Sequence, residues 1–312
     1  MKILIAGELN VDLVLQDYQS FPQPGKEVLV EDMSLTLGSA SAICAAGLAK
    51  LGNEVSFAGK VGCDAWGDLA LEYLGRLKVD LGRVIRDPQI KTGITVSVTS
   101  ARDRALITYL GSIAALRESD IEDSWFAGFA HLHVSSFYLQ QGLRPGLKSL
   151  LTRAHRAGLT TSIDPGFDPL DRWERDLIDT LEEADLFFPN EVELQAITGS
   201  DDPACALRAL DNGRTQTLAK LGRQGCMTLL QGRAVRIPAF PVQPIDTTGA
   251  GDSFNAGFLH KWLSGGDTLE AARFGAACGA LSTLGLGGTS AQPTEAEAAA
   301  FLAAHAADEV RT

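Results

Sequence analysis

Residues 246–257 read DTTGAGDSFNAG, a glycine-rich loop that runs into the start of a helix. Gly249 and Gly251 have no Cβ, so backbone N–H groups can converge around them. The first N–H groups of a helix have no partner inside the helix, and together with the helix dipole they favour an anion. We therefore expect a phosphate site here, which raises the question of why the loop also carries two carboxylates, Asp246 and Asp252.

The helix that follows this loop has one apolar face, which predicts that it is buried. The residues of that face are Phe254, Phe258, Leu259, Trp262 and Leu263. The local pattern leaves two interpretations of Asp252 open. It is the helix N-cap, a position that aspartate favours, or it is a general base that takes a proton from a hydroxyl attacking the phosphate.

Two common nucleotide-binding motifs are absent from the sequence. It has no Walker loop of the form GxxxxGK(S/T). Phe254 stands where a GxGxxG loop needs its third glycine, and GLGGTS at 285–290 fails as well. A dinucleotide-binding site is therefore disfavoured.

The composition is that of an ordinary soluble globular protein, with 312 residues, 45% hydrophobic and 21% charged. Lys and Arg number 27 and Asp and Glu number 39, so the net charge is −12. This charge disfavours nucleic acid and anionic membranes as partners. The five cysteines are scattered without a CxxC pair, which favours a reduced, cytoplasmic compartment with the thiols as small core residues. No apolar run approaches the ~20 residues of a membrane span.

Short apolar runs alternate with helical stretches along most of the chain. The expected strands lie at residues 2–7, 54–62, 131–136, 160–166, 186–190, 216–222 and 226–230, and the expected helices at residues 41–52, 66–77, 146–158, 190–199, 252–266 and 269–285. This alternation predicts an α/β fold in which helices cover both faces of a mostly parallel sheet. Ligands in such folds lie beyond the carboxyl ends of the strands. The length fits one domain over residues 1–312.

Two regions, residues 12–37 and 92–110, break this rhythm. Their apolar and polar residues alternate, which is typical of antiparallel strands rather than of βαβ units. We expect them to form a small antiparallel β sheet outside the main sheet, in the position of a lid. An exposed edge of such a sheet could pair with a second copy of the chain, so a homodimer through the lid is expected.

The sequence DTTGAGDSFNAGF resembles the carboxy-terminal signature of the ribokinase and phosphofructokinase-B (PfkB) family of carbohydrate kinases. Further matches are NVD at 10–12, GSASAICAAGLAKLG at 38–52, GKVGCDAWG at 59–67, NEVE at 190–193 and KLGRQG at 220–225. The resemblance implies a ribokinase-like three-layer core with a β lid. It also implies Mg²⁺-dependent transfer of the γ-phosphate of ATP to a hydroxyl of a small sugar or sugar derivative.

By the same resemblance, the loop carries the chemistry of phosphate transfer. Gly249, Ala250 and Gly251 would form the anion hole for the charge that develops during transfer. Asp252 would be the base that activates the acceptor hydroxyl. These residues are intact, which favours an active kinase over a non-catalytic sugar- or nucleotide-sensing protein on the same scaffold.

The resemblance also implies two cation sites. Glu193 would orient Mg²⁺ through water, because Mg²⁺ keeps much of its hydration shell. Asp246, Thr248 and the backbone near Gly288 would hold a monovalent cation such as K⁺, which would offset the charge of Asp246 and stiffen the loop. From the residues alone, Glu193 also fits a helix-capping pair with Asn190, and Asp246 also fits a cap of the TTG turn.

A third group of residues would contact the nucleotide. By resemblance these residues are Asn190, Lys220, Gly222, Gly225 and Ala276. The glycines permit a tight turn, and Lys220 either helps to neutralise phosphate or is a solvated surface lysine. Ala276 stands where many members have an asparagine near adenine, which implies relaxed nucleotide selectivity. Asp164, in the segment DPGFDP, is expected to support the phosphate side of the site.

The acceptor would bind to residues that lie mostly in the first part of the chain. By resemblance these residues are Asn10, Asp12, Gly38, Ser39, Ile43 and Ser136. Asp12 would accept hydrogen bonds from sugar hydroxyls, or else it is a plain polar turn residue, and Ser136 could instead belong to a buried strand. Members usually read GGxxxN where this chain has Ser39 and Ile43 in place of the second glycine and the asparagine. The pocket is therefore expected to accept a less hydroxylated or more apolar face, and a nucleoside kinase stays an alternative.

Overall fold

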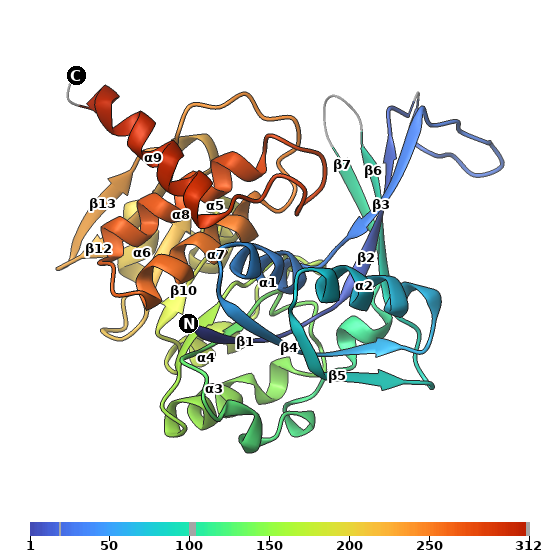
Figure 1. The fold of residues 1–312 in the computed structure, drawn as a ribbon, viewed down its shortest axis with the longest axis horizontal. Coiled ribbons are helices and arrows are strands. Elements are labelled where there is room, and N and C mark those ends of the chain that lie inside the picture. The colour runs from blue at the N-terminus through green and yellow to red at the C-terminus, as the bar shows by residue number, and fades with distance from the viewer. Residues whose placement is uncertain (19, 100–103, 310–312) are drawn as a thin grey trace.

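The computed structural model describes residues 1–18, 20–99 and 104–309. Residues 19 and 100–103, which belong to the two expected lid segments, lie outside the described residues. The described ranges form a large sheet covered by helices and a smaller sheet that projects from it (Figure 1).

The main sheet has nine strands within the described ranges. They are β1 (Lys2–Ala6), β4 (Glu54–Gly62), β5 (Asp80–Asp87), β8 (His131–Val134), β9 (Thr160–Ile163), β10 (Leu186–Phe187), β11 (Gln216–Lys220), β12 (Cys226–Leu230) and β13 (Arg233–Ile237). Their order across the sheet is β13-β12-β11-β10-β9-β8-β1-β4-β5. The strands from β11 to β5 pair in parallel, whereas β12 is antiparallel to both of its neighbours. The expected mostly parallel sheet is confirmed.

The sequence predicted every strand of this sheet except β5 and β13. These two strands are its edges, and both are only partly buried. Their sequences, DLGRVIRD and RAVRI, mix apolar and charged residues because one side of each strand faces solvent. They therefore lack the continuous apolar run that marks a central strand.

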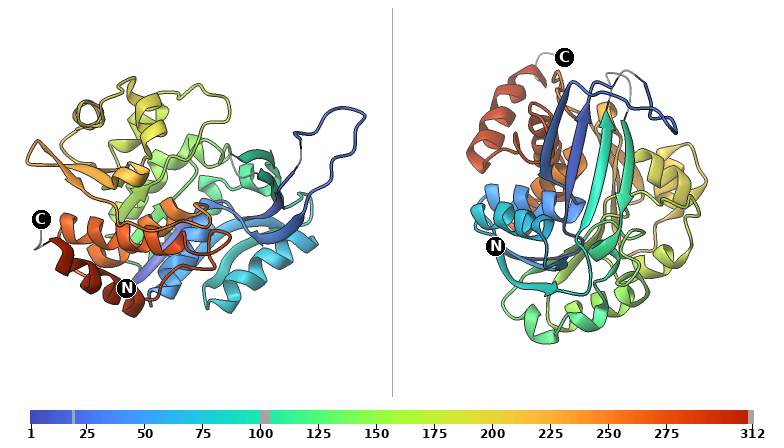
Figure 2. Two further views of the ribbon diagram at one scale, coloured as in Figure 1. Left: turned by 90° about the horizontal axis from the view of Figure 1, so that it is seen from above. Right: turned by 90° about the vertical axis from the view of Figure 1, so that its right-hand side faces the viewer.

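Helices cover both faces of the main sheet, so the core has three layers (Figures 1 and 2). One face carries α1 (Ala40–Lys50), α2 (Ala65–Arg76), α7 (Ala250–Leu263), α8 (Thr268–Ser282) and α9 (Glu295–Glu309), and the other carries α3 (Leu147–Arg156), α4 (Asp176–Leu181), α5 (Glu191–Thr198) and α6 (Pro203–Ala209). Successive side chains of β1 point to opposite layers. Ile3 and Ile5 join the first core, and Leu4 and Ala6 join the second. The expected three-layer α/β fold is confirmed.

The lid is a separate four-stranded sheet in the order β3-β2-β6-β7. Its strands are β2 (Asn10–Gln16), β3 (Asp32–Leu37), β6 (Gly93–Thr99) and β7 (Arg104–Tyr109). The β2–β3 and β6–β7 pairs are antiparallel, as expected, but the central β2–β6 pair is parallel. β2 follows β1 and β6 follows β5, so both leave the carboxyl edge of the main sheet in the same direction. Each strand then pairs with one that returns, and this geometry explains the mixed pairing.

The two faces of the lid differ in polarity. The face that lines the pocket described below is mainly polar and includes Asn10, Asp12, Ser34, Thr95 and Thr108. The opposite face carries apolar cross-strand pairs, Leu13 with Leu35, Leu15 with Met33 and Val96 with Ile107. Several of these side chains are exposed, Met33 by 60% and Ile107 by 57%. Part of this apolar face is therefore exposed, and β3 and β7, which form the edges of the lid, carry its exposed residues.

Two further expectations concern compartment and membrane. In the part of the chain that the structure describes, no helix combines the length and apolar character needed to cross a membrane. The five cysteines are free. Cys44, Cys226 and Cys278 are buried, as expected, but Cys63 and Cys205 are exposed, so the expectation that all the thiols are core residues is wrong.

Candidate active site

Gly249 forms the N-cap of α7 and has a φ of 72°, a backbone conformation that favours glycine. A Cβ at this position would lie 2.7 Å from the α-carbon of Gly288, so a side chain does not fit without a shift. The Ser253 N–H donates to the Gly249 carbonyl over 2.8 Å, within the first turn of α7. The glycine loop, residues 246–251, therefore leads into a helix N-terminus, as the sequence predicts.

Asp252 is the third residue of α7, whose N-cap is Gly249, so the N-cap interpretation of Asp252 is wrong. Its side chain is half-buried and lines a pocket. Burial raises the pKa of Asp252 well above its usual value, and the nearby Asp164 carboxylate raises it further, against the opposite effect of Lys220. A carboxylate with a raised pKa is a stronger proton acceptor.

Next to the glycine loop, Lys220 and Asp164 form a buried ion pair with an Nζ–Oδ2 distance of 2.6 Å. Asn255 donates to the same Asp164 oxygen over 2.6 Å. A Cβ on Gly251 would lie 3.3 Å from Nζ of Lys220, so this ammonium is close to the loop. Burial alone would lower the pKa of Lys220, but Asp164 and Glu193 raise it above its usual value. The interpretation of Lys220 as a solvated lysine is wrong.

The sequence analysis missed Asn255. It lies three residues after Asp252 on α7, and positions with this spacing share one face of a helix. Its side chain is fully buried although its neighbours Phe254 and Ala256 belong to the apolar core. A polar residue within an otherwise apolar helix was the available signal, because a buried amide needs hydrogen-bond partners.

Asn190 and Glu193 form a reciprocal capping pair at the start of α5. Oδ1 of Asn190 accepts from the Glu193 N–H over 2.9 Å, and Oε2 of Glu193 accepts from the Asn190 N–H over 2.8 Å, so the capping interpretation is confirmed. Burial, together with the Asp164 carboxylate, raises the pKa of Glu193 to about 7. Asp164, Asp252 and Glu193 all interact electrostatically with Lys220. Three carboxyl groups around one ammonium make this region acidic.

Asp246 links the glycine loop to the loop around Gly287. Its Oδ1 accepts from the N–H of Thr248 over 2.8 Å and from the hydroxyl of Thr248 over 2.7 Å, so its role as a cap of the TTG turn is confirmed. Its Oδ2 accepts from the Gly287 N–H over 2.8 Å. Gly288 packs against Gly249. Among the described residues, no group of three or more His, Cys, Asp or Glu is arranged to hold a metal ion directly.

A pocket of about 640 Å³ lies between the polar face of the lid and the glycine loop, and we call it the acceptor pocket. Of the predicted site residues, it is lined by Asn10, Asp12, Ser39, Ile43, Ser136, Asp246, Thr248, Gly249 and Asp252. The fold thus brings the predicted acceptor residues and the predicted base to one cavity. The residues predicted for the nucleotide are not among the described residues that line it.

Asp12 lies on β2, against the α-carbon of Gly38. A Cβ on Gly38 would be 2.1 Å from Oδ1 of Asp12 and 2.6 Å from Nδ2 of Asn10, so this contact requires glycine. Asn10 donates from Nδ2 to Oδ1 of Asp12 over 3.1 Å, and the Gly38 N–H donates to the Asn10 carbonyl over 3.1 Å. Asp12 is therefore held in a strand, and its interpretation as a turn residue is wrong.

The two departures from the family pattern have different structural consequences. Ser39 is the N-cap of α1 and keeps a glycine-like φ of 74°, while its hydroxyl accepts from the Ala42 N–H over 3.0 Å. Ile43 is 4% exposed. A Cβ on Gly288 would lie 2.6 Å from Cδ1 of Ile43, so this side chain supports the glycine loop as well as lining the acceptor pocket.

Glu8, which the sequence analysis also missed, lies two residues after the end of β1 and is 3% exposed. Its carboxylate accepts from the N–H of Ser41 over 3.2 Å, from the hydroxyl of Ser41 over 2.6 Å and from the hydroxyl of Ser136 over 2.9 Å. Ser136 follows β8 with a φ of 55°, so its interpretation as part of a buried strand is wrong. A carboxylate at the carboxyl end of a buried strand was the signal that pointed to Glu8.

The remaining residues predicted for the nucleotide lie on other elements. Gly222 and Gly225 form the turn between β11 and β12, with φ values of 54° and 88°. A Cβ on Gly225 would be 2.0 Å from the carbonyl oxygen of Ile237, so the tight turn requires glycine, as expected. Ala276 is half-buried on α8, which packs closely against α7.

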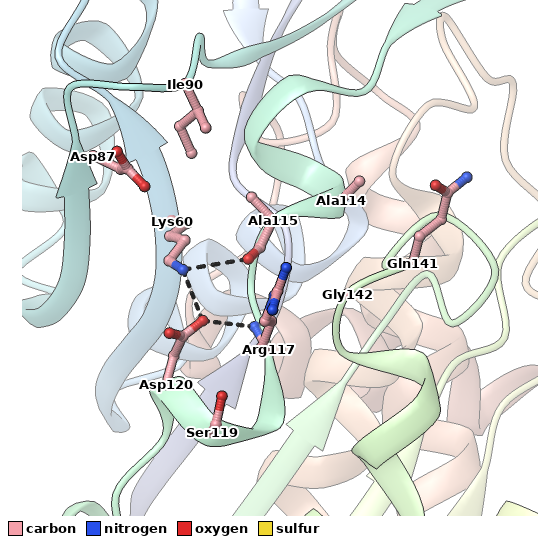
Figure 3. Close-up of a pocket in the computed structure, with 10 residues that line it drawn as sticks. All are labelled: Lys60, Asp87, Ile90, Ala114, Ala115, Arg117, Ser119, Asp120, Gln141 and Gly142. Carbon is pink, nitrogen blue, oxygen red and sulfur yellow. Dashed lines mark hydrogen bonds and ion pairs between the residues drawn. The ribbon is translucent and has the colours of Figure 1, made fainter.

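A second cleft, of about 560 Å³, lies at the ends of β4 and β5 (Figure 3). Lys60 donates to Oδ2 of Asp120 over 2.8 Å and to the Ala115 carbonyl over 3.3 Å. Asp120 also accepts from the backbone N–H of Arg117 over 2.8 Å. The lysine in this cleft is therefore already paired within the protein, and neither the glycine loop nor Asp252 lines the cleft.

The chain is similar to sugar kinases over nearly its whole length. It is 31% identical to the ATP-dependent ribose-1-phosphate kinase of Halopiger xanaduensis, over 97% of this chain and 98% of that protein. It is 28% identical to the ribokinase of Haemophilus influenzae, over 96% of this chain and 98% of that protein. The structure of Arabidopsis thaliana ribokinase complexed with ribose and ATP has a TM-score of 0.84 at 25% identity, and the match covers 96% of this chain and 98% of that one.

These similarities define an enzyme of the carbohydrate-kinase class with the ribokinase fold. The family model described as pfkB family carbohydrate kinase matches residues 1–295, and the chain belongs to this family. The family membership expected from the glycine loop is therefore confirmed.

Proposed function

We propose that the protein transfers the γ-phosphate of ATP to a hydroxyl of a small sugar or sugar derivative bound in the acceptor pocket. The observation that carries this proposal is Asp252, a half-buried carboxylate with a raised pKa at the N-terminus of α7 that lines this pocket. Relatives named for ATP-dependent sugar phosphorylation support the choice of substrates.

In this proposal Asp252 is the general base. The acceptor oxygen attacks the γ-phosphorus, its proton passes to Asp252, and the bond from the γ-phosphorus to the bridging oxygen of ADP breaks. Backbone N–H groups of Gly249, Ala250 and Gly251 stabilise the charge on the phosphoryl oxygens, since fixed dipoles aimed at developing charge need no reorganisation. The Lys220 ammonium, close to Gly251, adds positive charge on the same side.

Mg²⁺ fits the acidic region around Asp164, Glu193 and Asp252. Glu193 would orient it through water, which agrees with the absence of a direct ligand set among the described residues. When bound with ATP, Mg²⁺ would offset the charge of the phosphates. A structure neighbour solved with ATP and Mg²⁺ supports this choice of cation.

The oxygen atoms of Asp246, Thr248 and the Gly288 backbone fit a monovalent cation such as K⁺. Such a cation would offset the Asp246 charge and hold the glycine loop against the loop around Gly287, which Asp246 already contacts. We place the nucleotide beside Lys220. Its other contacts would be the capping residue Asn190, the turn with Gly222 and Gly225, and Ala276 on α8.

Two expectations about the whole protein also stay proposals. We treat residues 1–312 as one domain because the lid strands β2 and β6 each follow a strand of the main sheet. We keep a cytoplasmic location because the five cysteines are free. Fractionation of cells that express the tagged protein would test the location.

The proposed reaction predicts ADP release that depends on both ATP and an acceptor. The measurement is a coupled ADP assay with a panel of pentoses, hexoses and nucleosides, followed by mass spectrometry of the product. A sugar that gains one phosphate supports the proposal, whereas ATP hydrolysis without phosphate on any acceptor contradicts it. A nucleoside as the best acceptor would favour the second candidate, which the apolar Ile43 side chain in the pocket supports.

We expect Ile43→Asn to raise kcat/KM for ribose relative to less hydroxylated acceptors by about tenfold. A hydroxyl buried against Ile43 has no partner there, and an unpaired polar group costs about 1–3 kcal/mol. Asp12→Ala should weaken all acceptors, because a carboxylate can accept from two hydroxyls at once. The measurement is kcat/KM across the acceptor panel at saturating ATP.

Two control variants separate specificity from packing. Ile43→Val keeps an apolar side chain against the glycine loop and should not shift the preference. Asp32→Ala removes an exposed lid carboxylate that does not line the acceptor pocket, and should leave kcat/KM unchanged. An unshifted preference in Ile43→Asn would mean that Ile43 acts through packing alone, and unchanged kinetics in Asp12→Ala would mean that the acceptor binds elsewhere.

We further propose that the protein is a homodimer through the apolar face of the lid. The base of this face joins the first core through Val11 and Leu37, while Met33, Leu35 and Ile107 remain exposed. Figure 2 (right) shows the four lid strands side by side in front of the main body. Apolar patches of this kind mark interaction sites, and a two-fold axis lets one face pair with itself.

Light scattering should give about twice the chain mass of 33.1 kDa. Met33→Lys combined with Ile107→Lys should yield monomers, because burying these charges in the interface is unfavourable. Leu29→Lys, at a residue 72% exposed outside the lid strands, is the control and should leave the dimer intact. Wild-type protein that stays monomeric at high concentration would rule this interface out.

A further inference from the structure

The segment GKVGCD at residues 59–64 has no role in the proposed function. It ends β4 and leads into α2, and the described residues that line the acceptor pocket include none of its members. It nevertheless contacts both stretches of chain that connect lid strands β6 and β7 to the main body, at residues 88–92 and 110–120. We call these two stretches the lid base and residues 59–64 the anchor segment.

The anchor segment holds the chain just before it enters β6. Oδ2 of Asp64 accepts from the Thr92 N–H over 2.8 Å. The hydroxyl of Thr92 accepts from the Gly62 N–H over 2.9 Å, and Thr92 is only 1% exposed. Asp64 is also the N-cap of α2, because its Oδ1 accepts from the Gly67 N–H over 2.9 Å. One carboxylate therefore ties the start of a helix of the main body to the start of a lid strand.

Lys60 holds the chain after it leaves β7 (Figure 3). Its ammonium donates to the Ala115 carbonyl over 3.3 Å and to Oδ2 of Asp120 over 2.8 Å. Asp120 also accepts from the Arg117 N–H, which keeps its carboxylate within this stretch. Ala115 directly follows the short 3-10 helix η1 (Gly111–Ala114). The Lys60 side chain, which is 13% exposed, therefore fixes the end of η1 to β4.

The two stretches of the lid base are also tied to each other. The Ser112 N–H donates to the Lys91 carbonyl over 2.9 Å, and the Ser112 hydroxyl accepts from the Gly93 N–H over 3.1 Å. A Cβ on Gly93 would lie 2.6 Å from Cγ1 of Ile113, so the first residue of β6 packs directly against η1. The start of β6 and η1 therefore form one unit, which the anchor segment holds on both sides.

The chain between the two anchored points carries part of the acceptor pocket. Its pocket-lining residues are Thr95, Ser97, Leu106, Thr108 and Ile113. Successive residues of a 3-10 helix point in different directions, because three residues complete a turn. Ile113 accordingly lines the acceptor pocket, while Ala114 lines the cleft that contains Lys60. η1 is therefore a wall between the two cavities, with Lys60 on one side and the acceptor on the other.

We propose that Lys60 and Asp64 are positioning residues for the acceptor, which hold the lid base so that the lining residues of the lid meet the substrate. The proposal rests on the proposed function, because it concerns the same pocket. Both residues would act through the hydrogen bonds that they make to the lid base. Loss of either anchor should weaken acceptor binding and leave the chemical step unchanged, since Asp252 and Lys220 lie on α7 and β11.

Lys60→Met tests the anchor after β7, because methionine is similar in length but cannot donate to the carbonyl or the carboxylate. We expect KM for the preferred sugar of the acceptor panel to rise about tenfold, as for loss of a hydrogen bond to a charged group, with kcat within about twofold of wild type. Lys60→Arg keeps the donors, and the cleft of about 560 Å³ has room for the longer side chain, so KM should stay close to wild type. Lys148→Met, at the exposed pair with Glu182, is the control.

Asp64→Asn tests the anchor before β6. Asparagine is as good an N-cap as aspartate but has one acceptor oxygen in place of two. The variant should therefore keep the cap of α2, lose the bond from the Thr92 N–H and raise KM for the same sugar about tenfold. Asp202→Asn is the matched control, because Asp202 is the N-cap of α6, a helix in the opposite layer of the core.

The urea midpoint separates positioning from a general structural role. Positioning predicts a raised KM at unchanged kcat, with a midpoint close to that of the control variant. A lower midpoint and a lower kcat at unchanged KM would overturn the proposal, because less of the protein would then be folded while the pocket kept its shape. Thr92→Val covers the case in which the other variants do not fold. It removes only the hydroxyl that accepts from the Gly62 N–H and should raise KM about threefold.

Hydrogen exchange gives a readout that does not depend on activity. The N–H groups of Gly93 and Ser112 are bonded at the lid base, so they should exchange about tenfold faster in Lys60→Met and Asp64→Asn, while those of α6 keep the wild-type rate. Faster exchange there together with a raised KM supports the proposal, and unchanged exchange overturns it. If the wild type phosphorylates no acceptor, the proposed function fails, and sugar affinity measured by calorimetry then takes the place of KM in deciding this proposal.

Discussion

Replacing Asp252 with asparagine is expected to lower turnover by about 10²-fold or more. Asparagine has nearly the same shape but cannot take the proton of the acceptor hydroxyl, so the fold and ATP binding should be almost unaffected. The measurement is kcat from the coupled ADP assay, with ATP affinity measured by calorimetry. Asp68→Asn is the matched control, because Asp68 is an exposed carboxylate in the first turn of another helix, α2. Turnover close to wild type in Asp252→Asn would remove Asp252 as the base.

The pH dependence of turnover provides an independent check on the base. Burial raises the pKa of Asp252 above that of an ordinary carboxyl group, so its active, deprotonated form is present above the raised pKa and is lost as pH falls through it. Burial also raises the pKa of Glu193, to about 7, so Glu193 is the alternative titrating group. The acid limb of kcat should persist in Glu193→Gln and be absent from the residual activity of Asp252→Asn. Loss of that limb in Glu193→Gln would instead make Glu193 the titrating group.

Replacing Lys220 with methionine is expected to cost about 3–5 kcal/mol of unfolding free energy. The change leaves the carboxylate of Asp164, whose side chain is only 6% exposed, without its ion-pair partner. It also removes the ammonium nearest to Gly251, so turnover should fall as well. The measurement is the urea midpoint, followed by circular dichroism, with kcat on the folded variant.

The double variant Lys220→Met with Asp164→Asn should recover much of the lost stability, because no buried charge is then left unpaired. Lys148→Met is the control, since Lys148 pairs with Glu182 on the surface, where both side chains are about half exposed. An exposed pair contributes about 0–1 kcal/mol. If Lys220→Met and Lys148→Met lose similar stability, the buried pair does not stabilise the fold.

Local sequence patterns predicted much of the fold. The glycines of the loop and the apolar face of the helix that follows predicted the anion site, because the positive φ of Gly249 and a helical period are local properties. The continuous apolar runs of the central strands predicted the parallel sheet for a related reason. A strand that is buried on both faces needs apolar side chains at every position. The edge strands β5 and β13 were not predicted, because they are only partly buried and do not need apolar side chains at every position.

Strand direction in the lid was beyond the reach of the sequence. Alternating polarity in 12–37 and 92–110 predicted strands, but alternation is the same in parallel and antiparallel sheets with one polar face. The β2–β6 pair is parallel because β2 follows β1 and β6 follows β5, and β1 and β5 both end at the carboxyl edge of the main sheet. In the lid, the apolar side chains of these strands lie together on the face opposite the acceptor pocket.

The sequence by itself determined the family, the glycine loop and the position of Asp252 directly after it, because these depend on residues that are contiguous in the chain. Only the tertiary structure decided how that site is charged. Lys220 meets Asp164 across 56 residues, and Asn255 meets the same carboxylate across 91. Glu8 reaches Ser136 across 128 residues, because β1 and β8 are neighbours in the sheet. The order of the strands in the sheet decides which of these residues come into contact. No local sequence pattern encodes strand order, because each apolar strand can be buried equally well beside several others.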